Sequence, residues 1–157
     1  MATNLTVEGN TGTCGFLAFG SSSSLTLSVG GSNDTMESIA EIWDNGADLT
    51  TGSSTAFTAP VTGKYMLIFS GRLAALDIDS DYYYSYIVTS NRIYSRVLDA
   101  NDLGWGSDVG YMAMPAVSCV ADMDAGDTAV PQWYQSVGGS VQTQQHGDTY
   151  FCGFLCA

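Results

Sequence analysis

Short runs of β-branched and aromatic residues, cut at close intervals by Gly, Ser, Asn and Asp, constrain this chain more than any other feature. No long segment has the 3.6-residue periodicity of an amphipathic helix. Residues 36–44 have a helix-like spacing, but they fit a strand nearly as well. Eighteen glycines against three prolines are typical of a chain with many tight turns. The pattern predicts an all-β fold.

About ten such runs lie in 157 residues, separated by turn signals such as Asn45-Gly46 and Gly138-Gly139. Neither a repeat nor a domain boundary is visible, so we expect a single domain. In one domain, this number of strands leaves a sandwich, a barrel or a jelly roll. The expected strands are residues 15–20, 25–30, 38–44, 55–58, 63–76, 82–90, 92–99, 111–123, 128–137, 141–145 and 149–157.

The central run, residues 64–69, is apolar on both sides beyond its lysine. A strand that is apolar on both faces lies between two covered surfaces, whereas one sheet of a small sandwich normally faces water. Residues 82–87 are also aromatic on one side, and tyrosine is enriched where proteins meet. We therefore expect another subunit to cover the outer sheet face. The candidate interface residues are Tyr65, Leu67, Phe69, Tyr82, Tyr84, Tyr86 and Phe154.

The charge balance excludes several classes of partner. Sixteen acidic residues stand against four basic ones, which gives a net charge of −12. With so few cations the chain neutralises few phosphates, so we expect no binding to nucleic acid or to an anionic membrane. A basic partner surface is attracted instead. The opening residues are neither basic nor apolar, so we also expect no secretory signal, and no apolar run is long enough to cross a bilayer.

Three ordered motifs carry a resemblance to a known fold. They are Phe57-Thr58-Ala59-Pro60-Val61-Thr62-Gly63-Lys64-Tyr65, the turn Asp124-Ala125-Gly126-Asp127-Thr128, and the ending Tyr150-Phe151-Cys152-Gly153-Phe154-Leu155. They resemble the signature of the complement first-component globular head, in the tumour-necrosis-factor-like jelly-roll superfamily. The resemblance extends over about residues 15–157. It implies a ten-stranded-type jelly-roll sandwich of two antiparallel sheets over residues 14–157, after an N-terminal arm of residues 1–13.

Each signature residue also has a physical role of its own. We expect Phe57 to fill the core and Pro60 to end its strand, while Gly63 turns the chain into the central strand that Tyr65 anchors. Gly126 permits a tight hairpin, in which Asp127 accepts backbone N–H bonds. Gly153 lets the last strand, with Phe151, pass close to a large neighbour such as Trp43 or Tyr65. The fold-signature residues are Phe57, Pro60, Gly63, Tyr65, Gly126, Asp127, Phe151 and Gly153.

The resemblance further implies a homotrimer joined through the sheet that holds the first, last and central strands. The chain has no collagen-like stem, no expected secretion signal and little basic charge, unlike the complement proteins. Such stemless versions of the jelly roll are similar to virion proteins of tailed bacteriophages, which include capsid decoration (cement) proteins and fibre heads. The resemblance thus implies a structural protein on the outer surface of a phage capsid, with the major capsid protein as its partner.

Catalytic motifs are sparse. His146 is the only histidine and lies in an expected loop. A catalytic pair of Cys152 with His146, or a Ser–His146–Asp148 arrangement, remains open. No Gly-x-Ser-x-Gly motif occurs. Residues 104–110 depart from a nucleotide-binding loop and are interpreted as a surface loop that presents Trp105. We therefore expect no enzymatic activity and no cofactor.

Two further features leave alternatives open. The alternating carboxylates Asp77, Asp79 and Asp81 form either a solvated acidic turn or a calcium site, although the glycine and terminal glutamate of a helix–loop–helix site are missing. Cys14, Cys119, Cys152 and Cys156 do not have zinc spacing. We expect free, buried thiols, and a disulfide between the first and last strands is the alternative.

The leading functional hypothesis is a trimeric phage capsid decoration protein that bridges capsid subunits at three-fold positions. The alternatives are a receptor- or glycan-binding head of a phage fibre, with Trp105 as a stacking platform, and a secreted binding module of the same fold. The number of copies per particle distinguishes the first two.

Overall fold

The computed structural model describes residues 14–20, 25–100, 102, 104, 109–137 and 143–156. The expected N-terminal arm and the binding candidate Trp105 lie outside the described residues. Within them the chain is almost entirely strand and turn, as predicted. No helix in this part of the chain combines the length and the apolar character needed to cross a bilayer.

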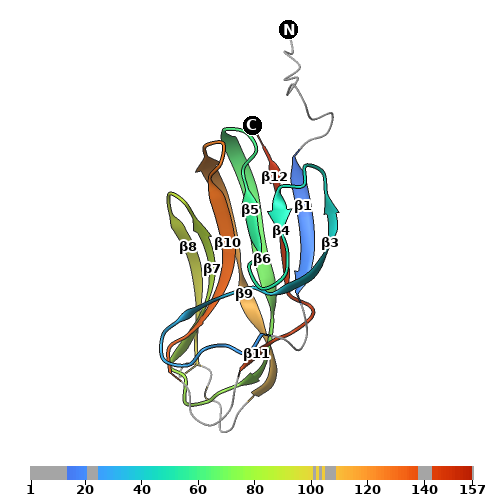
Figure 1. Cartoon of the computed structure of the whole chain (residues 1–157). Coiled ribbons are helices and arrows are strands. Elements are labelled where there is room, and N and C mark those ends of the chain that lie inside the picture. The colour runs from blue at the N-terminus through green and yellow to red at the C-terminus, as the bar shows by residue number, and fades with distance from the viewer. Residues whose placement is uncertain are drawn as a thin grey trace.

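Two antiparallel sheets of six strands pack face to face (Figure 1). In the first sheet the order is β9-β6-β12-β1-β3, and β11 pairs with the far end of β6. In the second sheet the order is β8-β7-β10-β5-β4, and β2 also pairs with β10. The strands are β1 Gly15–Gly20, β2 Asn33–Thr35, β3 Ser38–Asp44, β4 Leu49–Thr50, β5 Ala56–Thr58, β6 Gly63–Leu76, β7 Tyr82–Thr89, β8 Ile93–Asp99, β9 Val109–Met123, β10 Thr128–Gln135, β11 Gln144–Gln145 and β12 Tyr150–Leu155.

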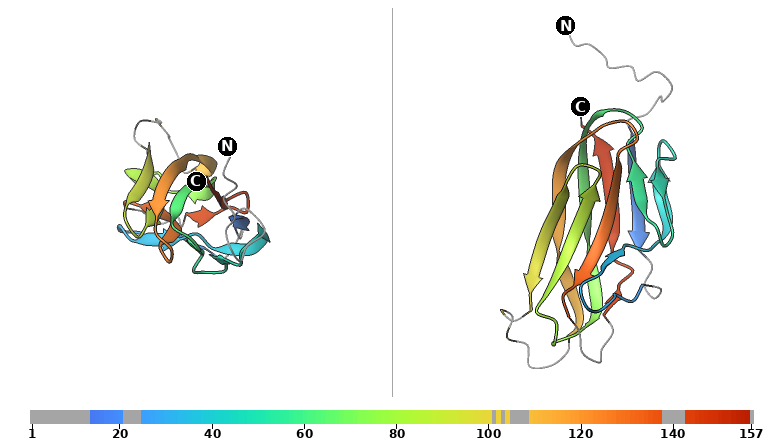
Figure 2. Two further views of the ribbon diagram at one scale, coloured as in Figure 1. Left: turned by 90° about the horizontal axis from the view of Figure 1, so that it is seen from above. Right: turned by 60° about the vertical axis from the view of Figure 1, so that its left-hand side comes forward.

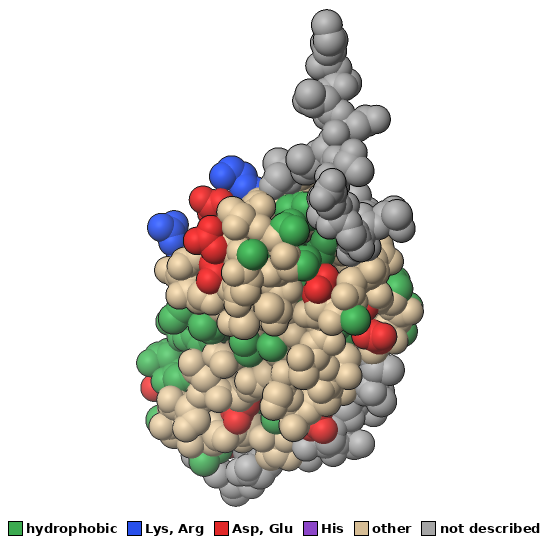
Figure 3. Space-filling model, turned by 45° about the horizontal axis from the view of Figure 1, so that its top comes forward, with side chains coloured by type: hydrophobic (Ala, Val, Ile, Leu, Met, Phe, Trp, Pro, Cys, Tyr) green, Lys and Arg blue, Asp and Glu red, His purple; other side chains and the backbone are tan. Residues whose placement is uncertain are grey.

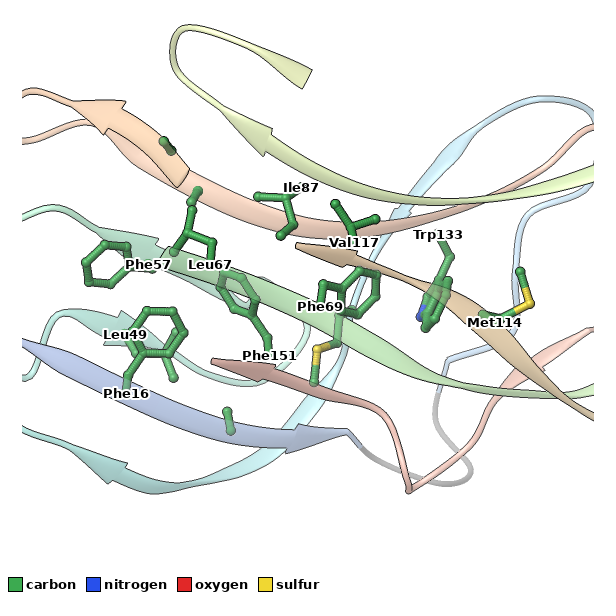
Figure 4. Packing of buried hydrophobic residues seen from close by; sticks show 14 of the residues in the cluster. Phe16, Leu49, Phe57, Leu67, Phe69, Ile87, Met114, Val117, Trp133 and Phe151 are labelled. Carbon is green, nitrogen blue, oxygen red and sulfur yellow. The ribbon is translucent and has the colours of Figure 1, made fainter. Parts of the chain in front are cut away.

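Side-chain alternation along each strand divides the chain between the core and the two outer faces. Phe16 of β1 stacks on Phe57 of β5 at 4.7 Å between ring centroids and contacts Phe151 of β12 at 4.9 Å. Nearer the other end of the sandwich, Phe69 packs against Trp133 at 4.4 Å. Figure 4 shows these rings pointing toward one another from both sheets. An aromatic core of this kind fixes the register of β6 and β12, because a shift by one residue would expose the rings.

The first and last strands lie side by side in the first sheet. Gly15 pairs with Phe154 and Phe19 with Tyr150, and the Leu155 N–H donates to the Cys14 carbonyl at 3.0 Å. The chain therefore enters and leaves the sandwich at one pole, and the turn between β6 and β7 lies toward the other (Figures 1 and 2).

The signature residues have most of the expected roles. Phe57 is in the core, and the Tyr65 hydroxyl donates to the Val61 carbonyl at 2.7 Å, which anchors the start of β6. Gly126 has φ +92°, a left-handed conformation that a tight hairpin requires. The Asp127 carboxylate accepts the Asp124 N–H at 2.9 Å.

The neighbour expected for Gly153 is wrong. A Cβ atom at this position would lie 2.7 Å from Leu67 and 2.9 Å from Phe16, not against Trp43 or Tyr65. The Trp43 ring instead lies over Gly15 of the adjacent strand, on the outer face.

One predicted strand is also wrong. Residues 25–30 do not form a strand of their own, although Leu27 is buried and its N–H donates to the Thr143 carbonyl. The short strand β2 forms instead over residues 33–35, where a loop was expected, because these residues pair with the exposed edge of β10. The alternation of apolar residues correctly indicated that Leu27 is buried. It gave no information on the backbone group to which Leu27 is hydrogen-bonded.

Candidate interaction surfaces

The outer face of the first sheet is apolar across its strands. On β6, Tyr65, Leu67 and Phe69 point into the core, so Met66 and Ile68 point outward. Their neighbours in the ladder continue the apolar surface, because Met66 pairs with Phe154 and Val120, and Ile68 with Cys152 and Ser118. The first-sheet face is defined here by the outward residues Leu17, Phe19, Trp43, Met66, Ile68, Val120, Tyr150, Cys152 and Phe154.

Several of these side chains are as exposed as surface residues. Phe154 is 50% exposed, Val120 52% and Trp43 42%. Lys64, at the same alternation as Met66, lies at the end of this face and forms an ion pair with Asp122 at 3.5 Å. A sheet face with this much exposed apolar surface is typical of a protein–protein contact rather than of a solvated surface.

The set of candidate interface residues predicted from the sequence is divided by the structure. Tyr65, Leu67 and Phe69 are fully buried in the domain core and are unable to contact another subunit. Their assignment to an interface is wrong because β6 presents the opposite alternation outward. Phe154 alone lies on the first-sheet face. Met66, Ile68, Val120, Leu17 and Trp43 were missed.

The remaining candidates, Tyr82, Tyr84 and Tyr86, lie on the outer face of the second sheet. They occupy alternate outward positions of β7, and Tyr134 of β10 lies beside Tyr84 in the ladder. The ring centroids of Tyr84 and Tyr86 are 5.1 Å apart at 9°, and those of Tyr82 and Tyr134 6.3 Å apart at 6°. The two pairs stand nearly perpendicular to each other.

These four tyrosines, with Val88, Ile93 and Val97 around them, define the tyrosine face. Val97 is 50% exposed and Ile93 60%, so the aliphatic rim is open to solvent. Burial, and next the neighbouring tyrosine hydroxyls, raise the pKa of Tyr86 above its usual value. The Tyr86 hydroxyl therefore stays neutral in the physiological pH range.

A polar cluster lies near the end of β6 that is distant from Lys64. Arg72 donates to the Asp148 carboxylate at 2.6 Å and contacts the His146 ring nitrogens at 3.2 Å. The Tyr111 ring packs edge-on to His146 and lies under the Arg72 guanidinium. In the described residues no serine, threonine or cysteine side chain is hydrogen-bonded to His146. The cluster orders the turn between β11 and β12.

The acidic loop after β6 is built as a turn. The Asp77 carboxylate is buried and accepts the Asp79 N–H at 2.9 Å, and the Tyr83 hydroxyl bonds to both backbone groups of Asp77. Asp79 and Asp81 are exposed. Among the residues that the structure describes, no group of three or more His, Cys, Asp or Glu side chains is arranged to hold a metal ion. Calcium binding by this loop stays a prediction.

The four cysteines are unpaired, and they differ in exposure: Cys14 is buried, Cys119 and Cys152 are half-buried, and Cys156 is exposed. Burial, together with the nearby Asp48 carboxylate, raises the pKa of Cys14 to about 12. Burial alone raises the pKa of Cys119 to about 11. These two thiols are therefore protonated and unreactive at neutral pH.

An open recess of about 180 Å³ is lined by Thr62, Asn91, Asp122, Met123 and Asp124. The Asn91 amide in it donates to Asp127 at 2.7 Å, and Thr62 contacts Asp124. These polar groups stabilise the turn between β9 and β10.

Comparison with solved structures identifies the fold of this two-sheet sandwich. The globular domain of zebrafish complement 1qA protein superposes with a TM-score of 0.66, over 93% of this chain and 98% of that domain. The chain has the fold of the complement globular head. Sequence identity to that domain is 15%, so the complement globular-head likeness establishes the jelly roll and not a shared ligand. No protein-family model matches the chain, and no curated protein matches it.

Proposed function

We propose that this chain is a non-enzymatic structural protein that assembles as a homotrimer and clamps onto a larger protein shell, as a capsid decoration (cement) protein on the outer surface of a phage head. The first-sheet face is the observation that carries the proposal. It presents half-exposed Phe154, Val120 and Trp43 on a broad sheet, where a second copy is the simplest way to remove them from water.

A decoration protein needs two contacts, one with its own copies and one with the shell. The chain has two unpartnered faces on opposite sheets, the first-sheet face and the tyrosine face. In this proposal the first closes the trimer and the second remains available to the major capsid protein. Each added joint buries apolar surface between shell subunits and so opposes the pressure of packaged DNA.

The trimer is tested by the mass in solution, by light scattering after size-exclusion chromatography. We expect about 50 kDa, three times the chain mass of 16.6 kDa. Phe154→Asp places a charge in the first-sheet face and should give a monomer. Val97→Asp is the matched control, since Val97 is also 50% exposed but lies on the opposite sheet, and this variant should remain trimeric. A wild-type monomer at micromolar concentration would refute the assembly.

The shell function is tested on particles. Heads stripped of this protein should release their DNA at a lower temperature than complete heads, and added protein should restore the difference. Quantitative mass spectrometry of particles should give hundreds of copies. A few dozen copies, with unchanged heat resistance after stripping, would favour a receptor-binding head of a fibre instead.

A further inference from the structure

The tyrosine face is nearly free of charged side chains, in a chain that carries a net charge of −12. Along β7, β8 and β10 the only outward charged residue is Asp99, which pairs with Tyr82 at one end of the face. The other outward residues are aromatic, aliphatic, hydroxyl-bearing or amide-bearing. They are Tyr82, Tyr84, Tyr86, Val88, Ile93, Ser95, Val97, Thr128, Val130, Gln132 and Tyr134. An uncharged centre is typical of a protein contact surface.

The tyrosine rings are held in place before any partner arrives. Each of the four contacts at least two others, through two parallel pairs set nearly perpendicular to one another. Rings that already restrain one another lose little side-chain entropy on binding. Tyr82 is 36% exposed, so its ring remains accessible beside Asp99. The aliphatic side chains at β8 leave apolar surface that sugar hydroxyls would not satisfy, which favours a protein over a glycan.

The charge distribution of this chain indicates which charge a protein partner of the tyrosine face would carry. Lys64 and Arg72 are engaged with Asp122 and Asp148 at the first sheet. Arg96 of β8 pairs with buried Ser85, on the other side of the strand from Val97, and its guanidinium donates to the Ser95 carbonyl at 3.0 Å, so along these three strands no basic residue stands at an outward position. Acidic side chains are spread over the surface, whereas the basic side chains visible in Figure 3 gather at one corner. A cationic partner is attracted from a distance, and aromatic rings near a carboxylate hold a cation on contact.

We propose that the tyrosine face docks an arginine-bearing surface of the protein partner, which deepens the proposed function by naming the contact with the shell. A guanidinium plane stacks on aromatic rings and donates to Asp99 or to tyrosine hydroxyls, which an ammonium group of the same charge does less well. The acidic surface supplies attraction for any cation, while the tyrosine face supplies the preference for arginine over lysine.

The test uses two fluorescent peptides of equal charge, octa-arginine and octa-lysine, titrated against the full chain and followed by anisotropy. Octa-arginine should bind about fivefold more tightly, corresponding to a cation–π contact. Tyr82→Leu/Tyr84→Leu should remove this preference and leave octa-lysine binding unchanged. Tyr111→Leu is the matched control, because this tyrosine is 60% exposed on the first sheet and already lies under Arg72. It should keep the preference.

A second pair of variants tests the proposal even if the double leucine variant does not fold. Asp99→Asn and Asp122→Asn remove the same charge, and only the former should weaken octa-arginine binding more than octa-lysine binding. Equal affinity of the wild-type chain for the two peptides, or equal losses in these two variants, would overturn the proposal. Mass measured on the same samples separates the two claims. A trimer without arginine preference would refute only the proposal that the tyrosine face docks arginine. A monomer that keeps the preference would refute only the proposed homotrimer.

Discussion

Gly153 on β12 provides the sharpest test of how the core is packed. A Cβ atom built at this position lies 2.7 Å from the Leu67 side chain, 2.9 Å from the Met66 carbonyl oxygen and 2.9 Å from the Phe16 ring. Contacts on three sides, one of them with the backbone, leave no direction in which a methyl group can move. The φ of Gly153 is not in the left-handed region, so sterics alone demand glycine there.

Gly153→Ala should therefore destabilise the fold. Overpacking a filled core costs about 1–3 kcal/mol, and the lower entropy of an unfolded chain with alanine offsets about 0.5 kcal/mol of it. The net loss corresponds to a melting temperature lower by roughly 2–8 °C for a chain of this size. Circular dichroism melts at one fixed protein concentration measure the change, since assembly would make the melting temperature depend on concentration.

Gly110→Ala is the control, because Gly110 also lies in a strand but a Cβ atom there has no neighbour within 4 Å. Its melting temperature should equal or slightly exceed that of the wild type, as expected when alanine replaces an unconstrained glycine. If Gly153→Ala melted at or above the wild-type temperature, the packing of β12 against Leu67 and Phe16 described above would be incorrect.

Further predictions concern Tyr65, Cys14 and the loop of Asp77. Tyr65→Phe removes the hydroxyl that bonds to the Val61 carbonyl and should lower the free energy of unfolding by about 1 kcal/mol in a guanidinium titration. Because the pKa of Cys14 is about 12 against an ordinary 9.0, mass-spectrometric alkylation at pH 8.5 should modify exposed Cys156 long before Cys14. The stability that the neutral Cys14 thiol adds is complete below pH 9 and is lost as the pH rises toward 12, so over that range wild type should lose melting temperature faster than Cys14→Ser. Chelator or added calcium should leave the melt unchanged if the loop of Asp77 is a solvated turn, and a rise with calcium would establish a site there.

Strand positions were largely predictable because turn residues and β-branched runs are local signals. The expected bounds of β1, β3 and β6 agree with the structure. The sequence also indicates which side of β6 faces outward, although the interface prediction chose the opposite side. Lys64 and Arg72 have the same alternation as Met66 and Ile68, and a long cation is rarely buried without a partner. That alternation would have placed Tyr65 and Leu67 in the core.

Other features depend on pairing between distant segments and have no local signal. Alternation showed that Tyr82, Tyr84 and Tyr86 share one face, but only the pairing of β7 with β10 places that face on the second sheet, beside Tyr134. The strand β2 likewise depends on the open edge of β10, not on the propensity of its three polar residues. Contacts of this kind follow from topology, which short sequence motifs do not specify.

The adjacency of β1 and β12 has a practical consequence for engineering. Since Cys14 and Leu155 are hydrogen-bonded neighbours at one pole, a segment joined directly before Cys14 or directly after Leu155 would leave the sandwich from that pole. A short linker would likewise connect Leu155 to Cys14, which makes this jelly roll a suitable scaffold for circular permutation or for multivalent display.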